Sequence, residues 1–126
     1  DGLAVTPIGV VRNALSPDSH PRVRSARSRL EIVPAYAGAL LGLEPGDHID
    51  VLFYFDRSPE VVPLQQRRHG DPNNPPSGVF TLRSPVRLSP IGVTRVEILE
   101  MEPYALVVSG LDAWDGSPVI DIKPAG

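Results

Sequence analysis

The sequence contains no cysteine, which excludes disulfides, thiolate metal sites and cysteine nucleophiles. Long apolar runs are also missing. Uncharged apolar stretches such as 51–55 are far shorter than the roughly 20 residues of a membrane-spanning helix. No basic segment followed by an apolar one opens the chain, as a secretory signal would. These absences favour a cytoplasmic protein that has no membrane partner.

Generic catalytic and cofactor motifs are absent as well. There is no glycine-rich phosphate loop, no GxSxG turn, no HExxH helix and no GxGxxG after a first strand. His20, His48 and His69 are too scattered to indicate a metal site, so none is expected. Any nucleotide-like cofactor must therefore bind by a route other than a Rossmann fold.

Proline and glycine, in contrast, are plentiful: fifteen and eleven residues divide a chain of 126 residues into short elements. Only 36–43, between Pro34 and the Pro45-Gly46 pair, is typical of a helix. Short β-rich segments separated by turns, with hardly any helix, favour one all-β domain over 1–126, either a barrel or a sandwich. The expected strands are 5–12, 49–55, 78–81, 94–100, 106–109 and 119–122.

The segment 58–77 holds five prolines together with Arg67 and Arg68 and is predicted to be a long flexible loop. A loop of this length in a compact domain is usually functional or disordered, and both interpretations stay open. If it orders, we expect it to do so on binding a partner.

The charge is slightly acidic, −3 overall, which argues against a generally basic nucleic-acid binder. The basic residues are nevertheless clustered, and only one of the twelve, Lys123, is a lysine. Arginine has a planar fork that suits carboxylates and phosphates. The clusters lie at 22–29, 67–68 and 83–87, and a solvated surface is the default interpretation of each one.

Two strings near the end of the chain are specific: RSPVRLSPIG at 83–92 and LDAWDGSPVIDIKP at 111–124. Together with PIGV at 7–10, they make the chain resemble the TrmO/YaeB family along almost its whole length. This resemblance implies an all-β fold, a small single-sheet β-barrel with one or two short helices, that binds S-adenosylmethionine without a Rossmann sheet. It implies a homodimer with the cofactor near the interface. It also implies methylation at N6 of threonylcarbamoyl-adenosine beside the anticodon of transfer RNA.

The resemblance assigns site residues by position. The cofactor contacts it implies are Pro21, Arg22, Val23, Asp56, Arg57, Arg83, Val93, Asp112, Ala113, Trp114 and Asp115. An arginine such as Arg22 or Arg83 can pair with the methionine carboxylate through two hydrogen bonds. Asp112 or Asp115 would face the sulfonium, although Asp115 followed by Gly116 is equally a turn signal.

Nucleic-acid contacts are expected from Arg67, Arg68, Arg87 and Ser89. No catalytic residue is assigned, but Asp56, Asp112 and Asp115 are candidates for a general base.

Three positions depart from the family pattern at the expected site. Val23 stands where the family has glutamine, Asp56 where it has histidine, and Ser89 where it has asparagine. Serine cannot reproduce the two-point contact of an amide. The leading hypothesis is a transfer-RNA methyltransferase, which the retained arginines favour because phosphate contacts need them. The three departures favour the alternatives. The alternatives are an S-adenosylmethionine-binding module without transfer-RNA activity, or a methyltransferase for a different small acceptor.

Overall fold

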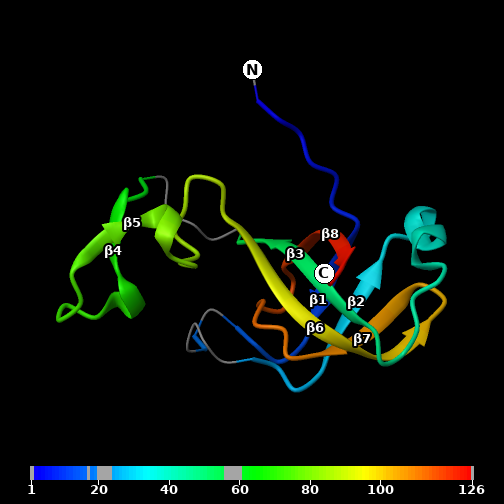
Figure 1. The fold of residues 1–126 in the computed structure, drawn as a ribbon. Helices are drawn as coiled ribbons and strands as arrows, with labels where there is room; N and C mark the ends of the chain where they lie inside the picture. The colour runs from blue at the N-terminus through cyan, green and yellow to red at the C-terminus, as the bar shows by residue number, and fades with distance from the viewer. Residues whose placement is uncertain (1, 17, 20–23, 56–60, 126) are drawn as a thin grey trace.

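Six antiparallel strands close a small barrel in the computed structural model, which describes residues 2–16, 18–19, 24–55 and 61–125 (Figure 1). The strands follow one another around the barrel in the order β1-β2-β7-β6-β3-β8. The expected all-β single-sheet barrel is confirmed. The barrel strands are β1 (Gly9–Arg12), β2 (Ser28–Ile32), β3 (His48–Tyr54), β6 (Ile91–Glu102), β7 (Ala105–Ser109) and β8 (Pro118–Pro124).

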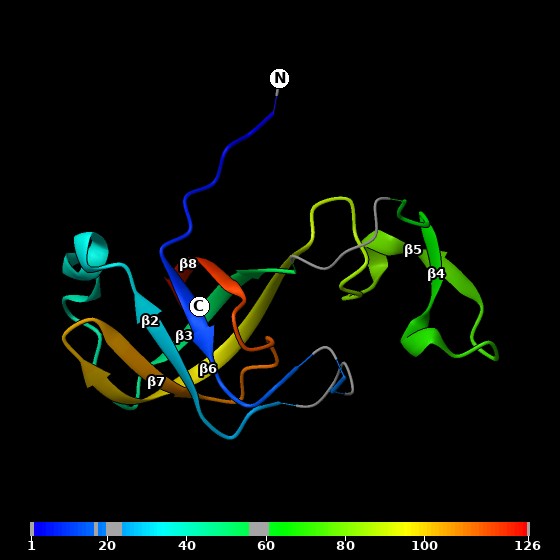
Figure 2. The ribbon, with the colours of Figure 1, turned by 180° about the vertical axis from the view of Figure 1, so that it is seen from behind.

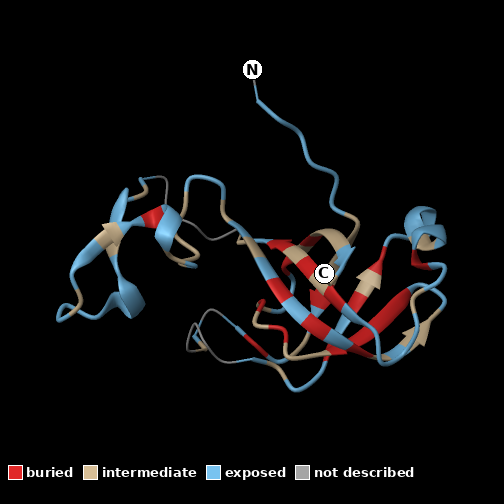
Figure 3. Ribbon diagram, viewed as in Figure 1, coloured by how far each residue is buried: buried red, intermediate tan, exposed pale blue. Residues whose placement is uncertain are grey.

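The core lies inside the barrel, where red buried positions alternate along the strands (Figure 3). Along β6, Thr94, Val96 and Ile98 are buried while their neighbours are wholly or partly exposed, which is the period-two pattern of a strand with one inward face. Ile49 and Phe53 of β3 meet them from the paired strand. The long β6 thus joins the core to the end of the barrel where it pairs with Tyr54 of β3.

The strand β2 has no counterpart among the expected strands, because its outward residues are charged. Leu30 and Ile32 are buried and alternate with Arg29 and Glu31, so half of the strand belongs to the arginine cluster. Arg29 donates to Glu102 of β6, and this hydrogen bond raises the pKa of Arg29. The cluster is therefore partly a ladder of ion pairs on the outside of the barrel.

A separate lobe lies beside the barrel, which we call the distal lobe (residues 61–90, Figures 1 and 2). It contains β4 (Gln65–Arg67), the 3-10 helices η2 (Arg68–Gly70) and η3 (Val79–Thr81), and β5 (Pro76–Gly78). The prediction of a strand at 78–81 is wrong, since β5 ends at Gly78 and η3 follows. Within the expected loop 58–77, residues 65–67 and 76–77 pair as β4 and β5, and η2 lies between them. Residues 58–60 lie outside the described part of the chain.

The expected helix is the 3-10 helix η1 (Pro34–Leu40), which begins two residues earlier than the expected range and is followed by Gly42 with φ of +97°. Proline suits the first position of a helix, and a positive φ favours glycine where the chain turns away. No helix in the described part of the chain is long and apolar enough to cross a membrane.

Gly9 makes the pairing of β1 with β2 possible. It lies opposite Ile32, and a Cβ atom at this position would be 2.2 Å from the carbonyl oxygen of Glu31. The obstructing atom belongs to the backbone, so only movement of a strand could relieve the overlap.

We therefore expect Gly9→Ala to lower the free energy of unfolding by about 1–3 kcal/mol, as overpacking does elsewhere. Thermal and urea denaturation would measure it. Gly38→Ala is the matched control, because a Cβ at Gly38 meets nothing within 4 Å. Equal stability of Gly9→Ala and the unchanged protein would contradict the prediction.

Candidate functional site

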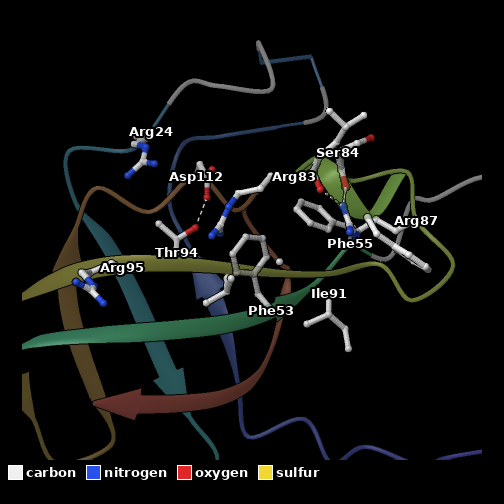
Figure 4. A pocket seen from close by; sticks show the side chains of 14 residues that line it. Arg24, Phe53, Phe55, Arg83, Ser84, Arg87, Ile91, Thr94, Arg95 and Asp112 are labelled. Carbon is white, nitrogen blue, oxygen red and sulfur yellow. Dashed lines mark hydrogen bonds between the residues drawn. The ribbon is translucent and has the colours of Figure 1, made fainter. Parts of the chain in front are cut away.

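A cavity of about 530 Å³ lies where the end of the barrel meets the distal lobe (Figure 4). Its walls come from β3, from the first half of β6, from 80–87 of the distal lobe and from the turn at Asp112. The volume falls in the range of small-molecule sites. The cavity brings together residues as far apart in the sequence as Arg24 and Asp112.

Aromatic side chains form one wall of this cavity. Phe53 and Phe55 pack edge to face with ring centroids 5.0 Å apart. Gly92 of β6 lies opposite Phe53, and a Cβ atom there would be 2.7 Å from Phe53 Cζ and 2.8 Å from Phe55 Cε2. The bare backbone of Gly92 therefore lets both rings lie over β6. Apolar rings of this kind exclude water and suit a flat ligand.

One described carboxylate lines the cavity, that of Asp112. The hydroxyl of Thr94 donates to Asp112 Oδ1 at 2.6 Å, and Thr94 is itself 6% exposed. The hydrogen bond fixes the direction of the carboxylate. Asp112 thus offers a held negative charge to a ligand that carries a positive one.

Two arginines reach the cavity from the loop that follows η3. Arg87 Nη1 donates to the carbonyls of Leu82 and Ser84, at 2.7 and 3.1 Å, so part of this guanidinium braces its own loop. Arg83 extends into the cavity in Figure 4, and no hydrogen bond joins its guanidinium to another described residue. Arg83 can therefore use its planar fork on an anionic ligand.

Two further arginines line the cavity from the barrel side. Arg24 Nη1 donates to the carbonyl of Gly110 at 3.2 Å, next to the turn that carries Asp112. Arg95 of β6 approaches Asp50 Oδ1 of the paired strand at 3.4 Å. The described lining thus has four guanidinium groups and one carboxylate.

The turn that carries Asp112 is held by Asn13. The Asn13 side chain donates to Ser28 Oγ and to the carbonyl of Ala113, both at 2.9 Å. The Asn13 backbone N–H donates to Asp115 Oδ1 at 3.0 Å. The Asp115 carboxylate therefore stabilises this turn, as the Asp115-Gly116 pair indicated in the sequence. The turn sets the path of the chain into β8.

The remaining expected site residues lie at the cavity, elsewhere in the barrel, in the distal lobe or outside the described residues. Val93 lines the cavity, whereas Ala113 is in the core and Trp114 is half-buried outside the lining. Arg67, Arg68 and Ser89 belong to the distal lobe and do not line the cavity. The residues that lie outside the described part of the chain are Pro21, Arg22, Val23, Asp56 and Arg57.

Sequence reasoning missed the aromatic wall, Thr94 and the placement of Arg24. One available signal was Gly92, because glycine inside a strand often marks the close approach of another group. Thr94 gave no signal, since its partner Asp112 is 18 residues away. Within the described residues, no group of three or more histidine, aspartate or glutamate side chains gathers as a metal site would require.

Comparison with known proteins places this geometry in a family. Residues 12–125 match the model of the tRNA-methyltransferase O N-terminal domain. A probable S-adenosyl-L-methionine-binding protein of Methanothermobacter thermautotrophicus is 40% identical over 97% of this chain and 89% of its own length. A putative S-adenosylmethionine-dependent methyltransferase of Pseudomonas aeruginosa is 34% identical over 96% of this chain and 54% of its own.

The crystal structure of TrmO from Pseudomonas aeruginosa is similar over the whole chain, with a TM-score of 0.77 and 29% sequence identity. The present chain spans 57% of that protein, so it corresponds to little more than half of it. The expected resemblance is confirmed: the chain belongs to the tRNA-methyltransferase O N-terminal domain family.

Proposed function

We propose that this domain transfers a methyl group from S-adenosylmethionine to N6 of threonylcarbamoyl-adenosine beside the anticodon of transfer RNA. The coarser part follows from the family and its relatives: the chain is a methyltransferase that uses S-adenosylmethionine. The observation that supports the proposal most is the cavity, in which Arg83, Asp112 and an aromatic wall line one space.

The cavity residues fit the charges and shape of S-adenosylmethionine. Its methionine carboxylate suits the planar fork of Arg83, and its sulfonium suits the carboxylate that Thr94 holds in place. The aromatic wall of Phe53 and Phe55 suits an adenine ring. The carboxylate, the sulfonium and the adenine ring therefore each have a matching group among the described residues.

Methyl transfer from a sulfonium is an in-line displacement, and the bound cofactor supplies an electrophilic methyl group. The protein mainly positions the reactants and excludes water, as Phe53 and Phe55 do on one side. The Asp112 carboxylate would stabilise the positive charge of the sulfonium and, as the methyl group transfers, that of the acceptor nitrogen. As the one carboxylate in the described lining, Asp112 is also the candidate to accept the proton that this nitrogen loses.

Arg68 is our candidate for a phosphate contact with transfer RNA. It is exposed at the start of η2, and its guanidinium has no hydrogen bond to another described residue. Arg67 is less available, because its Nη1 donates to the carbonyls of Pro72 and Asn74. Arg87 is likewise engaged in its own loop. We therefore assign the RNA contact of the distal lobe to Arg68 first.

A methyltransferase for a different acceptor remains the second candidate. The observation that favours it is Ser89, an exposed residue just before β6, where the family pattern has asparagine. A hydroxyl cannot offer the paired donor and acceptor that read a base or an amide. The cofactor side of the cavity would be the same in both cases.

We expect Arg83→Ala to weaken S-adenosylmethionine binding about tenfold to a hundredfold in titration calorimetry, because hydrogen bonds with charged groups contribute about 1.5–3 kcal/mol. Asp112→Asn should weaken the binding of S-adenosylmethionine more than that of S-adenosylhomocysteine, which lacks the sulfonium charge. Arg68→Ala is the control and should bind both as the unchanged protein does. Absence of heat with the unchanged protein would contradict the proposed pocket.

For the acceptor, we expect mass spectrometry to find N6-methylated threonylcarbamoyl-adenosine after transfer RNA that lacks this methyl group is incubated with protein and S-adenosylmethionine. Arg68→Ala should lower the yield at moderate salt and reduce the salt dependence of binding, since a phosphate contact releases counterions. An unchanged nucleoside profile would remove this acceptor and favour the second candidate.

We also propose that the domain works as a homodimer through the distal lobe. Large apolar side chains of this lobe are strongly exposed: Val61 at 82%, Leu64 at 62%, Phe80 at 81% and Leu88 at 62%. Such exposure is typical of a surface that binds another protein.

We expect sedimentation equilibrium to show a dimer that Leu64→Asp weakens. Leu41→Asp, on the 94% exposed side chain after η1, should not weaken it. A monomer at every concentration would contradict the proposal.

A further inference from the structure

We propose that Arg24 binds the carboxylate of the methyl acceptor, so that the cavity selects an acceptor that is anionic near the reacting nitrogen. The inference rests on the proposed function, because threonylcarbamoyl-adenosine carries the carboxylate of its threonine part. It adds a specificity-determining residue that the motifs of the sequence do not point to.

The first observation is the excess of positive charge in the cavity. Its described lining holds four arginines and one aspartate, although the whole chain has a net charge of −3. S-adenosylmethionine has a single carboxylate, and its sulfonium and ammonium groups are positive. One guanidinium is therefore enough for the cofactor, and the remaining positive charge suits a second anionic group.

The second observation concerns which arginines are available. Arg87 braces its own loop through Leu82 and Ser84, and Arg95 approaches Asp50. Arg83 is assigned to the cofactor carboxylate. Arg24 is the cavity arginine that remains for a second anion.

The contacts of Arg24 leave most of its hydrogen-bonding capacity unused. Its one described hydrogen bond is from Nη1 to the carbonyl of Gly110, and a guanidinium has five N–H donors. Its neighbours in the sequence differ, because Arg27 pairs with Glu100 and Arg29 with Glu102. No described carboxylate lies within ion-pair distance of Arg24. Arg24 therefore has an orientation fixed by Gly110 and a fork free for a carboxylate.

The position of Arg24 matches the acceptor side of the reaction. In Figure 4, Asp112 is seen between Arg24 and Arg83, and all three line the cavity. If Arg83 holds the cofactor and Asp112 lies by the sulfonium, then Arg24 faces the side from which the acceptor approaches. A bidentate pair with the threonine carboxylate would orient N6, which the carbamoyl group links to the threonine part, for in-line attack.

The test uses the nucleoside threonylcarbamoyl-adenosine, which has no phosphate, with the protein saturated by S-adenosylhomocysteine. We expect Arg24→Gln to weaken nucleoside binding by roughly tenfold to a hundredfold, while the affinity for S-adenosylmethionine stays within about twofold. An analogue of the nucleoside in which an amide replaces the carboxylate should bind weakly, and with equal affinity to the unchanged protein and to Arg24→Gln. Arg27→Gln is the matched control, since Arg27 is close in sequence but pairs with Glu100 outside the cavity.

Three results would overturn the inference. In the first, Arg24→Gln weakens binding of the nucleoside and of its amide analogue equally. In the second, it weakens binding of S-adenosylmethionine. In the third, it weakens binding of an unmodified anticodon stem-loop instead, which would assign Arg24 to a phosphate contact. Its failure is separable from that of the proposed function. Arg24-dependent nucleoside binding without methyl transfer supports the inference and contradicts the reaction. Methyl transfer with unchanged kinetics in Arg24→Gln supports the reaction and contradicts the inference.

Discussion

The close approach of two phenylalanine rings to the backbone of Gly92 is the constraint on which the site depends. Phe53 and Gly92 are direct partners across β3 and β6, so the ring of Phe53 crosses a position that has no side chain. Phe55 packs on it from just beyond the end of β3. Any Cβ at position 92 would push both rings away. The position of the aromatic wall therefore depends on the register of β3 with β6 and on the absence of a side chain at Gly92.

The polar side of the cavity depends on a different set of contacts. The turn that carries Asp112 is held on one side by the side chain of Asn13 and on the other by the bridge between Ser25 and Leu111. Thr94, buried at the barrel wall, then fixes the carboxylate itself. A charged group placed in this way needs little reorganisation when a ligand binds, which is how preorganised sites favour a transition state.

The arginine clusters separate by function once the chain is folded. Arg27 and Arg29 pair with glutamates on the outside of the barrel, where exposed ion pairs contribute little to stability. Arg24 turns into the cavity, and Arg67 closes the hairpin of the distal lobe. Clusters that look alike in the sequence thus contain structural braces next to arginines that line the cavity.

The sequence alone predicted the fold class, the family and two residues that line the cavity, Arg83 and Asp112, because turns, alternation and motifs are local signals. It missed β2, whose outward face is charged and resembles a solvated segment, and it placed a strand where η3 lies. Only the tertiary structure decided that Asp115 serves the turn, that Phe53 and Phe55 form a wall, and that Arg24 enters the cavity. The physical reason is that these facts depend on strand register and on contacts such as that between Arg24 and Gly110, 86 positions apart.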